Sequence, residues 1–167
     1  RDRDGQIIGV IGFSVDVTAR KRAEQTLRES EERLRLALDA ARIGIFDWDI
    51  PGERVTWSRW HEELWGIKPG TFAGTYEAFA ERVHPDDLVG LNDQVASCMR
   101  SGEPYAREFR VVWPDGSVHW ISGAGEFEFS EAGAPVRMRG IVRDITEQKR
   151  AQDALRERDA MFFAICE

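Results

Sequence analysis

The chain carries one of its segments twice, and this duplication limits the architectures that it can adopt. Residues 5–29 align without gaps with residues 133–157, and both copies contain an Asp-x-Thr motif followed by an Ala-x-x-x-Leu-Arg-Glu series. The two copies lie 128 positions apart, and a period this long is a whole domain with its connector, whereas solenoid units run to about 20–50 residues. We therefore expect part of a tandem array: the end of one domain, a linker helix, a complete domain and the start of a second linker helix.

Each copy is expected to form a strand that leads into a helix. Residues Ile7–Asp16 are a β-branched run typical of a strand, and the Thr18 hydroxyl can cap the helix that follows. A heptad seam runs along that helix and continues in phase in the second copy, at Ala23, Leu27, Ser30, Leu34, Ala37, Ala41, Ala151, Leu155, Arg158, Phe162 and Ile165. Such a seam predicts parallel coiled coils between two chains; the alternative is a helix that lies on its own domain.

The composition excludes several classes of partner. A formal net charge of −7 leaves no broad basic surface, so we expect no direct contact with nucleic acid. No apolar run approaches the roughly 18 residues of a membrane span and no signal-peptide layout is present, so we expect a cytoplasmic chain without direct membrane contact. Cys98 and Cys166 have no metal-ligand spacing and are expected to be reduced thiols.

The segment between the two copies alternates short strands with short helices. The pattern predicts strands over 43–50, 55–57, 105–113, 118–129 and 136–145, and helices over 59–65, 76–83 and 88–100. Pro85 is expected to end one helix, and an Asp at 86 or 87 to cap the next. Consecutive hairpins, including one at residues 114–116, favour an antiparallel sheet with the helices packed over one face, which is an α+β fold.

An ordered set of motifs in this segment resembles the PAS domain with its C-terminal PAC motif. The set comprises residues 47–49, 55–58 and 84–87, then Arg110, 115–116 and Trp120, and the closing series from Gly140 to 144–146. The resemblance covers about residues 33–150, and residues 5–18 resemble the PAC tail of a preceding PAS domain. It implies a five-stranded antiparallel sheet of order 2-1-5-4-3 that cups a pocket beneath short helices and is flanked by amphipathic coiled-coil helices.

The resemblance also implies a domain organisation and a role. Residues 1–18 would be the PAC tail of a preceding domain, 19–41 a linker helix, 42–146 the PAS/PAC domain, and 147–167 the start of the next linker helix. Such modules sense small molecules, light, oxygen or redox state, or dimerise, upstream of output domains. We expect a sensory relay module in a multi-PAS sensor histidine kinase, acting as a homodimer beside adjacent PAS and output domains. The alternatives are a diguanylate cyclase parent, a ligand-free dimerisation scaffold, a flavin- or haem-binding redox sensor, and a lyase or isomerase that uses the cupped sheet.

Strand alternation predicts an apolar wall that would line any ligand pocket. Its members are Phe46, Trp48, Val55, Trp57, Leu91, Val95, Phe109, Val111, Trp120, Met138, Gly140 and Val142. Because such a wall serves equally well as a core, we favour a small core, empty or filled with water, over a cofactor site. His119 alternates with Trp120 along its strand, and we expect His119 to face outward.

The residue patterns of catalysis and of cofactor binding are missing. His61, His84 and His119 each stand alone, without an HExxH or GxSxG pattern, so we expect neither an enzyme active site nor a metal. The family's haem domains often take an axial histidine from the long central helix, which here has none, although His61 keeps haem open. The cysteine motif of flavin photochemistry is absent, while six tryptophans leave a non-covalent flavin open.

The corner from Asp144 through Ile145 to Thr146 is the candidate for signal relay, and the first copy repeats it with Asp16 and Thr18. It joins the last strand to the helix that leaves the domain, so a distortion of the sheet can tilt that helix. We expect Asp144 to hold the corner by a charge-assisted bond and Thr146 to cap the helix; a plain strand-to-helix turn is the alternative. Arg139 and Arg143 are expected to pair with acids of the incoming helix.

Overall fold

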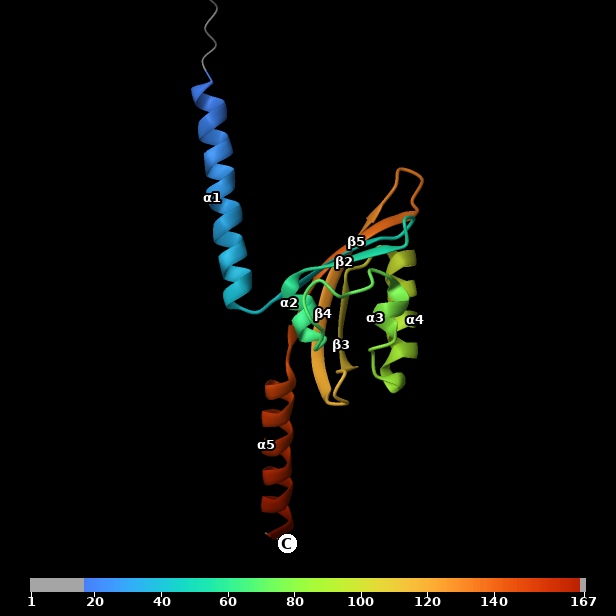
Figure 1. Ribbon diagram of the computed structural model, residues 1–167. Coiled ribbons are helices and arrows are strands. Elements are labelled where there is room, and N and C mark those ends of the chain that lie inside the picture. The colour runs from blue at the N-terminus through green and yellow to red at the C-terminus, as the bar shows by residue number, and fades with distance from the viewer. Residues whose placement is uncertain (1–16, 166–167) are drawn as a thin grey trace, which may run out of the picture. The chain divides into compact units, whose positions relative to one another are not determined.

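The computed structural model describes residues 17–165, and the chain divides into two compact units, Arg1–Ala37 and Leu38–Glu167. The strand predicted at Ile7–Asp16, and Asp16 with it, lies outside the described residues. Helix α1 (Thr18–Ala40) forms the described part of the first unit, and its last turn belongs to the second (Figure 1). No helix among the described residues is long and apolar enough to span a membrane.

Helix α1 buries none of its side chains within this chain. The seam residues Leu27 and Leu34 are 59% and 61% exposed, and an ion pair between Arg20 and Glu24 at 2.8 Å lies along its surface. Isolated helices owe little stability to their own hydrogen bonds and usually need an apolar face packed against a partner. The seam supplies such a face, and among the described residues its Leu27 and Leu34 stay exposed.

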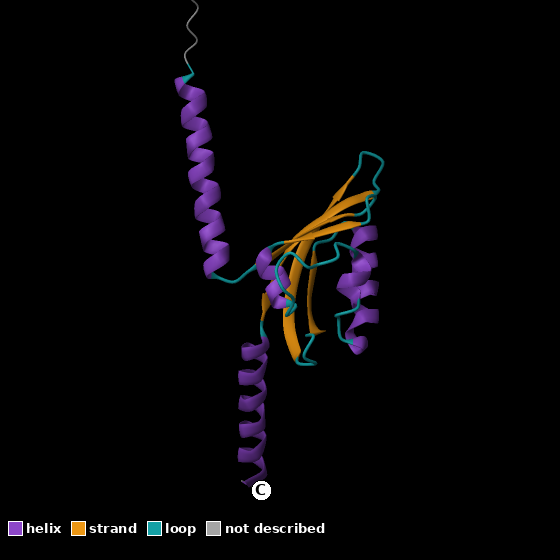
Figure 2. Ribbon diagram, in the orientation of Figure 1, coloured by secondary structure: helices purple, strands orange, loops and turns teal. Residues whose placement is uncertain are grey.

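The second unit is built on one five-stranded antiparallel sheet, which confirms the predicted α+β fold. The strands are β1 (Gly44–Asp49), β2 (Arg54–Trp57), β3 (Tyr105–Val112), β4 (Val118–Phe129) and β5 (Pro135–Asp144). Their order is β2-β1-β5-β4-β3, as the family resemblance implies, and Figure 2 shows the strands in orange as one sheet. The two ends of the domain sequence, β1 and β5, therefore pair at the centre of the sheet.

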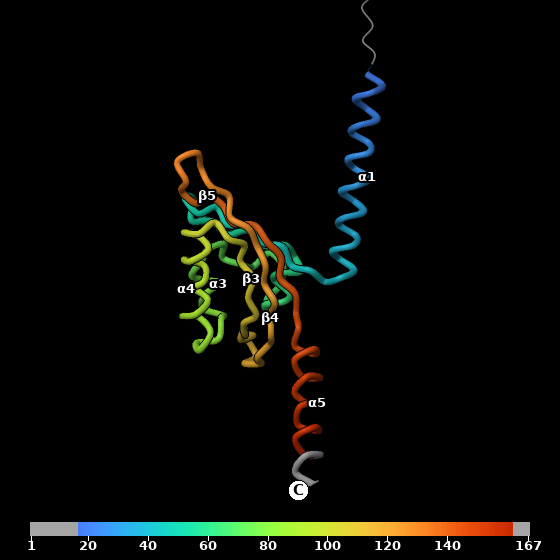
Figure 3. Tube along the Cα trace, turned by 180° about the vertical axis from the view of Figure 1, so that it is seen from behind, coloured from blue at the N-terminus to red at the C-terminus, as the bar shows by residue number. Residues whose placement is uncertain are grey.

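Three helices connect β2 to β3, and a fourth leaves the last strand. They are α2 (Arg59–Leu64), α3 (Tyr76–Ala80), α4 (Pro85–Ser101) and α5 (Thr146–Ile165). Helices α3 and α4 lie together over one face of the sheet, here called the inner face (Figures 1 and 3). Helix α5 continues directly from β5.

The start of α4 differs from its prediction. The helix begins at Pro85, earlier than expected, and His84 is its N-cap, with the ring Nδ1 accepting from the Asp86 backbone N–H at 3.3 Å. No aspartate caps this helix. The Asp87 carboxylate instead binds Arg110 of β3 through Nε at 2.9 Å, Nη2 at 2.7 Å and the backbone N–H at 2.8 Å. This bidentate pair fastens α4 to the sheet and holds the pKa of Asp87 below its usual range.

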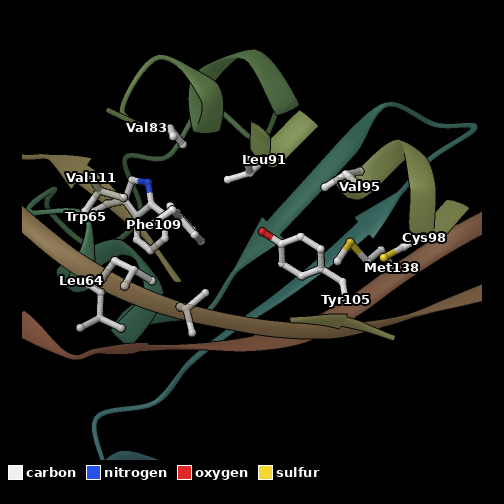
Figure 4. Close-up of a cluster of buried hydrophobic side chains, with 12 residues drawn as sticks. Leu64, Trp65, Val83, Leu91, Val95, Cys98, Tyr105, Phe109, Val111 and Met138 are labelled. Carbon is white, nitrogen blue, oxygen red and sulfur yellow. The ribbon is translucent and has the colours of Figure 1, made fainter. Parts of the chain in front are cut away.

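The core lies between the inner face and the helices that cover it. Figure 4 shows Leu91 and Val95 of α4 facing Tyr105, Phe109 and Met138 of the sheet. Trp65, which follows α2, is completely buried beside them.

The centre of the sheet depends on a close approach at Gly140. Its α-carbon faces inward with Met138 and Val142, as predicted, but the Phe46 ring lies directly over it. A Cβ at this position would lie 2.6 Å from Phe46 Cζ and 2.7 Å from the Gly125 Cα. Gly140 is therefore a packing glycine rather than part of a pocket wall, a role that strand alternation alone cannot distinguish.

We expect Gly140→Ala to destabilise the protein by roughly 3 kcal/mol or more, because the added methyl group meets backbone that cannot move aside. The matched control is Gly123→Ala on the neighbouring strand, where the nearest atoms to a Cβ all belong to side chains, the closest being Phe109 Cε1 at 3.3 Å, and which should cost about 1 kcal/mol or less. Urea unfolding followed by circular dichroism measures both. Equal destabilisation by the two substitutions would contradict this account of the sheet centre.

Candidate functional site

A cavity of about 60 Å³ lies between the inner face and the covering helices. Many of the predicted wall residues line it, namely Phe46, Trp48, Val55, Trp57, Leu91, Val95, Phe109, Met138 and Val142. Sequence reasoning missed five further lining residues, His61, Tyr76, Phe79, Tyr105 and Gly123. Most of these come from α2, α3 and the first residue of β3, where the segments are too short for periodicity to show which side faces inward.

The cavity is small because aromatic side chains fill the space around it. The Trp57 ring stacks on Phe72 at 3.5 Å and on His61 at 4.0 Å, and Trp48 stacks on Tyr76 at 5.0 Å, measured between ring centres. A volume of this size holds a few water molecules or a very small solute, whereas pockets for drug-sized ligands measure about 300–1,000 Å³. A flavin or a haem would have to displace these aromatic side chains.

His61 is the one histidine in the cavity wall. It is 2% exposed, and neither ring nitrogen has a hydrogen-bond partner among the described residues. Burial lowers its pKa to about 3, so the imidazole stays neutral at physiological pH. Stacking on Trp57 and edge-on packing against Phe46 at 5.9 Å hold the ring in place. Within residues 17–165, no group of histidine, cysteine and acidic residues could hold a metal ion.

Besides Gly140, two predicted wall residues, Val111 and Trp120, do not line the cavity. Val111 faces inward and is fully buried, but it packs in the core away from the cavity. Trp120 lies on the outer face of the sheet, under the Arg110 guanidinium at 5.6 Å and the Lys149 ammonium at 4.9 Å from its ring centre. Its alternation with inward-facing Ile121 requires this placement.

The side chain of His119 was expected to face outward, and this prediction is wrong. It lies on the inward side of β4 rather than outward, stacked on Trp113 with ring centres 3.8 Å apart. The alternation of His119 and Trp120 was read correctly, but their faces were exchanged. Cations on the outer face give the Trp120 ring favourable partners there, and the sequence does not show that they would gather at this point.

The corner after β5 fastens α5 to β4. The Asp144 carboxylate accepts from the Thr146 backbone N–H at 2.7 Å. The Thr146 hydroxyl accepts from the Trp120 backbone N–H at 2.9 Å, and the Ile145 backbone N–H donates to the Trp120 carbonyl at 2.8 Å. Asp144 thus caps the helix, while Thr146, expected to be the cap, bonds to the neighbouring strand. The corner is more than a plain turn. The corresponding Thr18 begins α1.

Charged side chains on the outer face add to this attachment. Lys149, in the first turn of α5, pairs with Glu108 of β3 at 2.6 Å and lies over Trp120. Arg139, expected to pair with an incoming helix, pairs with Glu128 of the neighbouring strand. The start of α5 therefore contacts two strands of the sheet.

We expect acid to destabilise the fold through His61. The unfolded chain takes up a proton near the ordinary pKa of 6.5, whereas the folded state resists protonation until about pH 3. The contribution of neutral His61 is therefore complete above pH 6.5 and falls by about 1.4 kcal/mol for each pH unit below it, until about pH 3. Between pH 7.5 and pH 5, His61→Phe should lose about 2 kcal/mol less unfolding free energy than the wild type.

Urea unfolding at the two pH values measures this difference. His84→Gln is the comparison variant, because it removes a histidine at a helix cap outside the cavity; the decrease in stability between the two pH values should be less affected by it than by His61→Phe. Identical slopes for the wild type and His61→Phe would show that the imidazole is not buried in its neutral form.

Known proteins share the fold of this chain. A family model described as "PAS fold" matches residues 54–142. Among solved structures, a sensory box histidine kinase/response regulator from Burkholderia thailandensis has a TM-score of 0.69 and 27% identity, covering 79% of this chain and 98% of that one.

Two curated relatives are much longer proteins. A probable diguanylate cyclase of Escherichia coli is 30% identical over 155 residues, which are 93% of this chain and 14% of the relative. The sensor protein FixL of Bradyrhizobium diazoefficiens is 28% identical over 128 residues, which are 77% of this chain and 25% of the relative. The chain thus spans a quarter or less of each of them. Since the family model covers more than half of the chain and the strand order agrees, this chain belongs to the PAS family.

Proposed function

We propose that this chain is a sensory relay module, in which a distortion of the sheet is passed to the departing helix α5. The observation that carries the proposal is the attachment of Ile145 and Thr146 to Trp120. The same two strands, β4 and β5, line the cavity through Gly123, Met138 and Val142.

The path from the cavity to α5 is short and made of stiff elements. Val142 of β5 lines the cavity and lies two residues before Asp144, the cap of α5. Gly123 of β4 lies three residues after Trp120, which holds Thr146. A shift between the two strands therefore moves both anchors of the helix, and contiguous packed elements of this kind are able to carry coupling between sites.

The parent protein is proposed to be a multidomain signalling protein that works in the cytoplasm. In this proposal residues 1–18 end a preceding PAS domain, and α1 and α5 link this module to its neighbours. A sensor histidine kinase is our first choice of parent, supported by the likeness to the Burkholderia sensory box histidine kinase, and the likeness to the sensor protein FixL supports a sensory role. The diguanylate cyclase relative supports the alternative output.

The stimulus is proposed to be a very small solute, or a mechanical input from the preceding domain without any ligand. The cavity volume of about 60 Å³ supports this choice over a bulky cofactor. If no ligand binds, the module acts as a dimerisation and relay scaffold. An absorption spectrum separates these cases from a flavin or haem sensor, because the protein should show no visible band.

Dimerisation is proposed to occur through the linker helices. The seam residues Leu27 and Leu34 lie seven positions apart and are both exposed within one chain. Packing them against a second copy would bury apolar area that the single chain leaves in water. A parallel pair would also carry α5 from both chains in the same direction, as a shared output requires.

The relay proposal predicts a specific effect of Thr146→Val in the parent protein. The substitution keeps the side-chain volume but leaves the Trp120 backbone N–H without its acceptor. The attachment of α5 to β4 should thereby lose about 1–3 kcal/mol of stability. The basal output, measured as autophosphorylation or as cyclic dinucleotide formation, should change by roughly fivefold or more. Thr71→Val, whose hydroxyl bonds only within its own loop, is the control and should leave the output unchanged. A folded Thr146→Val protein with normal output would contradict the relay.

The dimer proposal predicts that charge at the seam separates the chains. The double variant Leu27→Glu/Leu34→Glu should raise the dissociation constant of the dimer at least roughly tenfold. Leu36→Glu alters an equally exposed leucine, at 58%, that lies off the seam, and it should dimerise like the wild type. Sedimentation equilibrium measures all three proteins. A wild-type chain that stays monomeric at high concentration would exclude the coiled-coil pairing.

A further inference from the structure

A line of polar contacts runs from the β3–β4 hairpin to the α5 corner. The Ser117 hydroxyl donates to the Asp115 carboxylate at 2.6 Å and lies 3.0 Å from His119 Nε2. On the other side of the ring, His119 Nδ1 lies 3.6 Å from Asp144 Oδ2. The other oxygen of Asp144 accepts from the Thr146 N–H. His119 therefore lies between the hairpin and the cap of α5.

The direction of each hydrogen bond fixes which ring nitrogen carries the proton. Ser117 has a single hydroxyl proton, and the ionised Asp115 carboxylate can only accept. Donation from Ser117 holds the pKa of Asp115 below its usual range, with a smaller electrostatic contribution from His119. Since the hydroxyl proton is used on Asp115, Nε2 of His119 must donate to the Ser117 oxygen.

This tautomer leaves Nδ1 as a bare acceptor in an unfavourable place. The atom is buried and has no hydrogen-bond partner among the described residues, and Asp144 Oδ2, which cannot donate, lies 3.6 Å from it. Two acceptors that face each other gain nothing, whereas a proton on Nδ1 would create a charge-assisted N–H···O contact. In a doubly protonated ring, Nδ1 would face Asp144 Oδ2 and Nε2 would face the Ser117 oxygen, so both ring N–H groups would have an acceptor.

We propose that His119 is a proton-operated latch on the α5 joint, closed when Nδ1 is protonated and bonded to Asp144. Histidine is the side chain whose charge changes most readily between pH 5 and 8. The latch is inferred from the contacts of His119 with Ser117 and Asp144. Its effect on signalling rests on the relay proposed for α5. Acidification would draw Asp144 toward the ring, tighten the cap of Thr146 and stiffen the start of the helix.

The groups around the ring are carboxylates and an indole. The charged groups that interact with His119 are the two carboxylates, Asp144 and Asp115; in the described part of the chain, neither forms an ion pair with a lysine or an arginine. The ring face stacks on Trp113, whose Nε1 donates to the Leu64 carbonyl at 3.0 Å. The stack fixes the plane of the ring, with Nδ1 toward Asp144 and Nε2 toward Ser117.

Nitrogen-15 NMR of the wild-type chain tests the tautomer without any substitution. Above pH 8, the His119 ring should show protonated Nε2 and bare Nδ1. As the pH falls, the Thr146 amide signal should shift with the same midpoint as the ring. A neutral ring protonated at Nδ1, or a Thr146 amide that ignores the His119 titration, would overturn the proposal.

Hydrogen exchange then tests the latch. The protection factor of the Thr146 amide, relative to that of the Val112 amide in the same sample, should be roughly threefold to tenfold higher at pH 5.5 than at pH 8. In Asp144→Asn, whose side-chain oxygen still accepts from the Thr146 N–H, this gain should vanish. His84→Gln, at a separate histidine beside Asp86, should keep it. A gain that survives in Asp144→Asn would refute the latch.

Output assays in the parent protein separate the latch from the relay. If the latch is present but the relay is wrong, the NMR coupling appears while the output of Asp144→Asn keeps the wild-type dependence on pH. If the latch and the relay are both correct, the NMR coupling appears in the wild type and the output of Asp144→Asn loses the wild-type dependence on pH.

Discussion

The structure depends on the way the first residues after β5 are held by β4. Trp120 donates its backbone N–H to the Thr146 hydroxyl and accepts from the Ile145 N–H, so the chain that leaves the domain is bonded to the interior of the sheet. Backbone groups at this depth must find partners or incur a cost of about 1–3 kcal/mol. The direction in which α5 begins is therefore set by the sheet, and the sheet cannot shift there without moving the helix.

The small cavity and the attachment of α5 lie close together because both are built on strands β4 and β5. The inner face packs aromatic rings around about 60 Å³ of space, while the outer face bears cations over Trp120 and an ion pair between Lys149 and Glu108. In the described part of the chain, the sheet thus separates the cavity from the outer-face contacts of α5. A packed core responds to a local change by shifting between discrete arrangements rather than by deforming smoothly. This property suits the module to the relay role proposed here.

Much of the fold could be predicted because its signals are local. The duplicated Asp-x-Thr tail, the Pro-Asp-Gly hairpin and the alternation of apolar residues indicated the strands within a residue or two, and the family resemblance supplied the strand order. The errors arise where alternation gives two faces without saying which one is covered. The faces of Trp120 and His119 were exchanged because the cations that attract Trp120 come from β3 and α5. Gly140 was assigned to a wall because a sequence cannot show a ring lying over it.

The joint itself was located correctly, but its chemistry was not. Thr146 was expected to cap its own helix, and the structure uses Asp144 for that purpose and Thr146 for a bond across the sheet. Such a long-range bond leaves no periodic trace in a sequence.

Amide exchange of Trp120 and Ile145 in the intact chain tests the central claim most directly. If the sheet holds the start of α5, both amides should exchange only when the whole domain unfolds, with the same protection as the strand interior. If either amide exchanges at rates typical of a frayed helix end while the sheet stays protected, the helix is not fastened to β4 and the account is wrong.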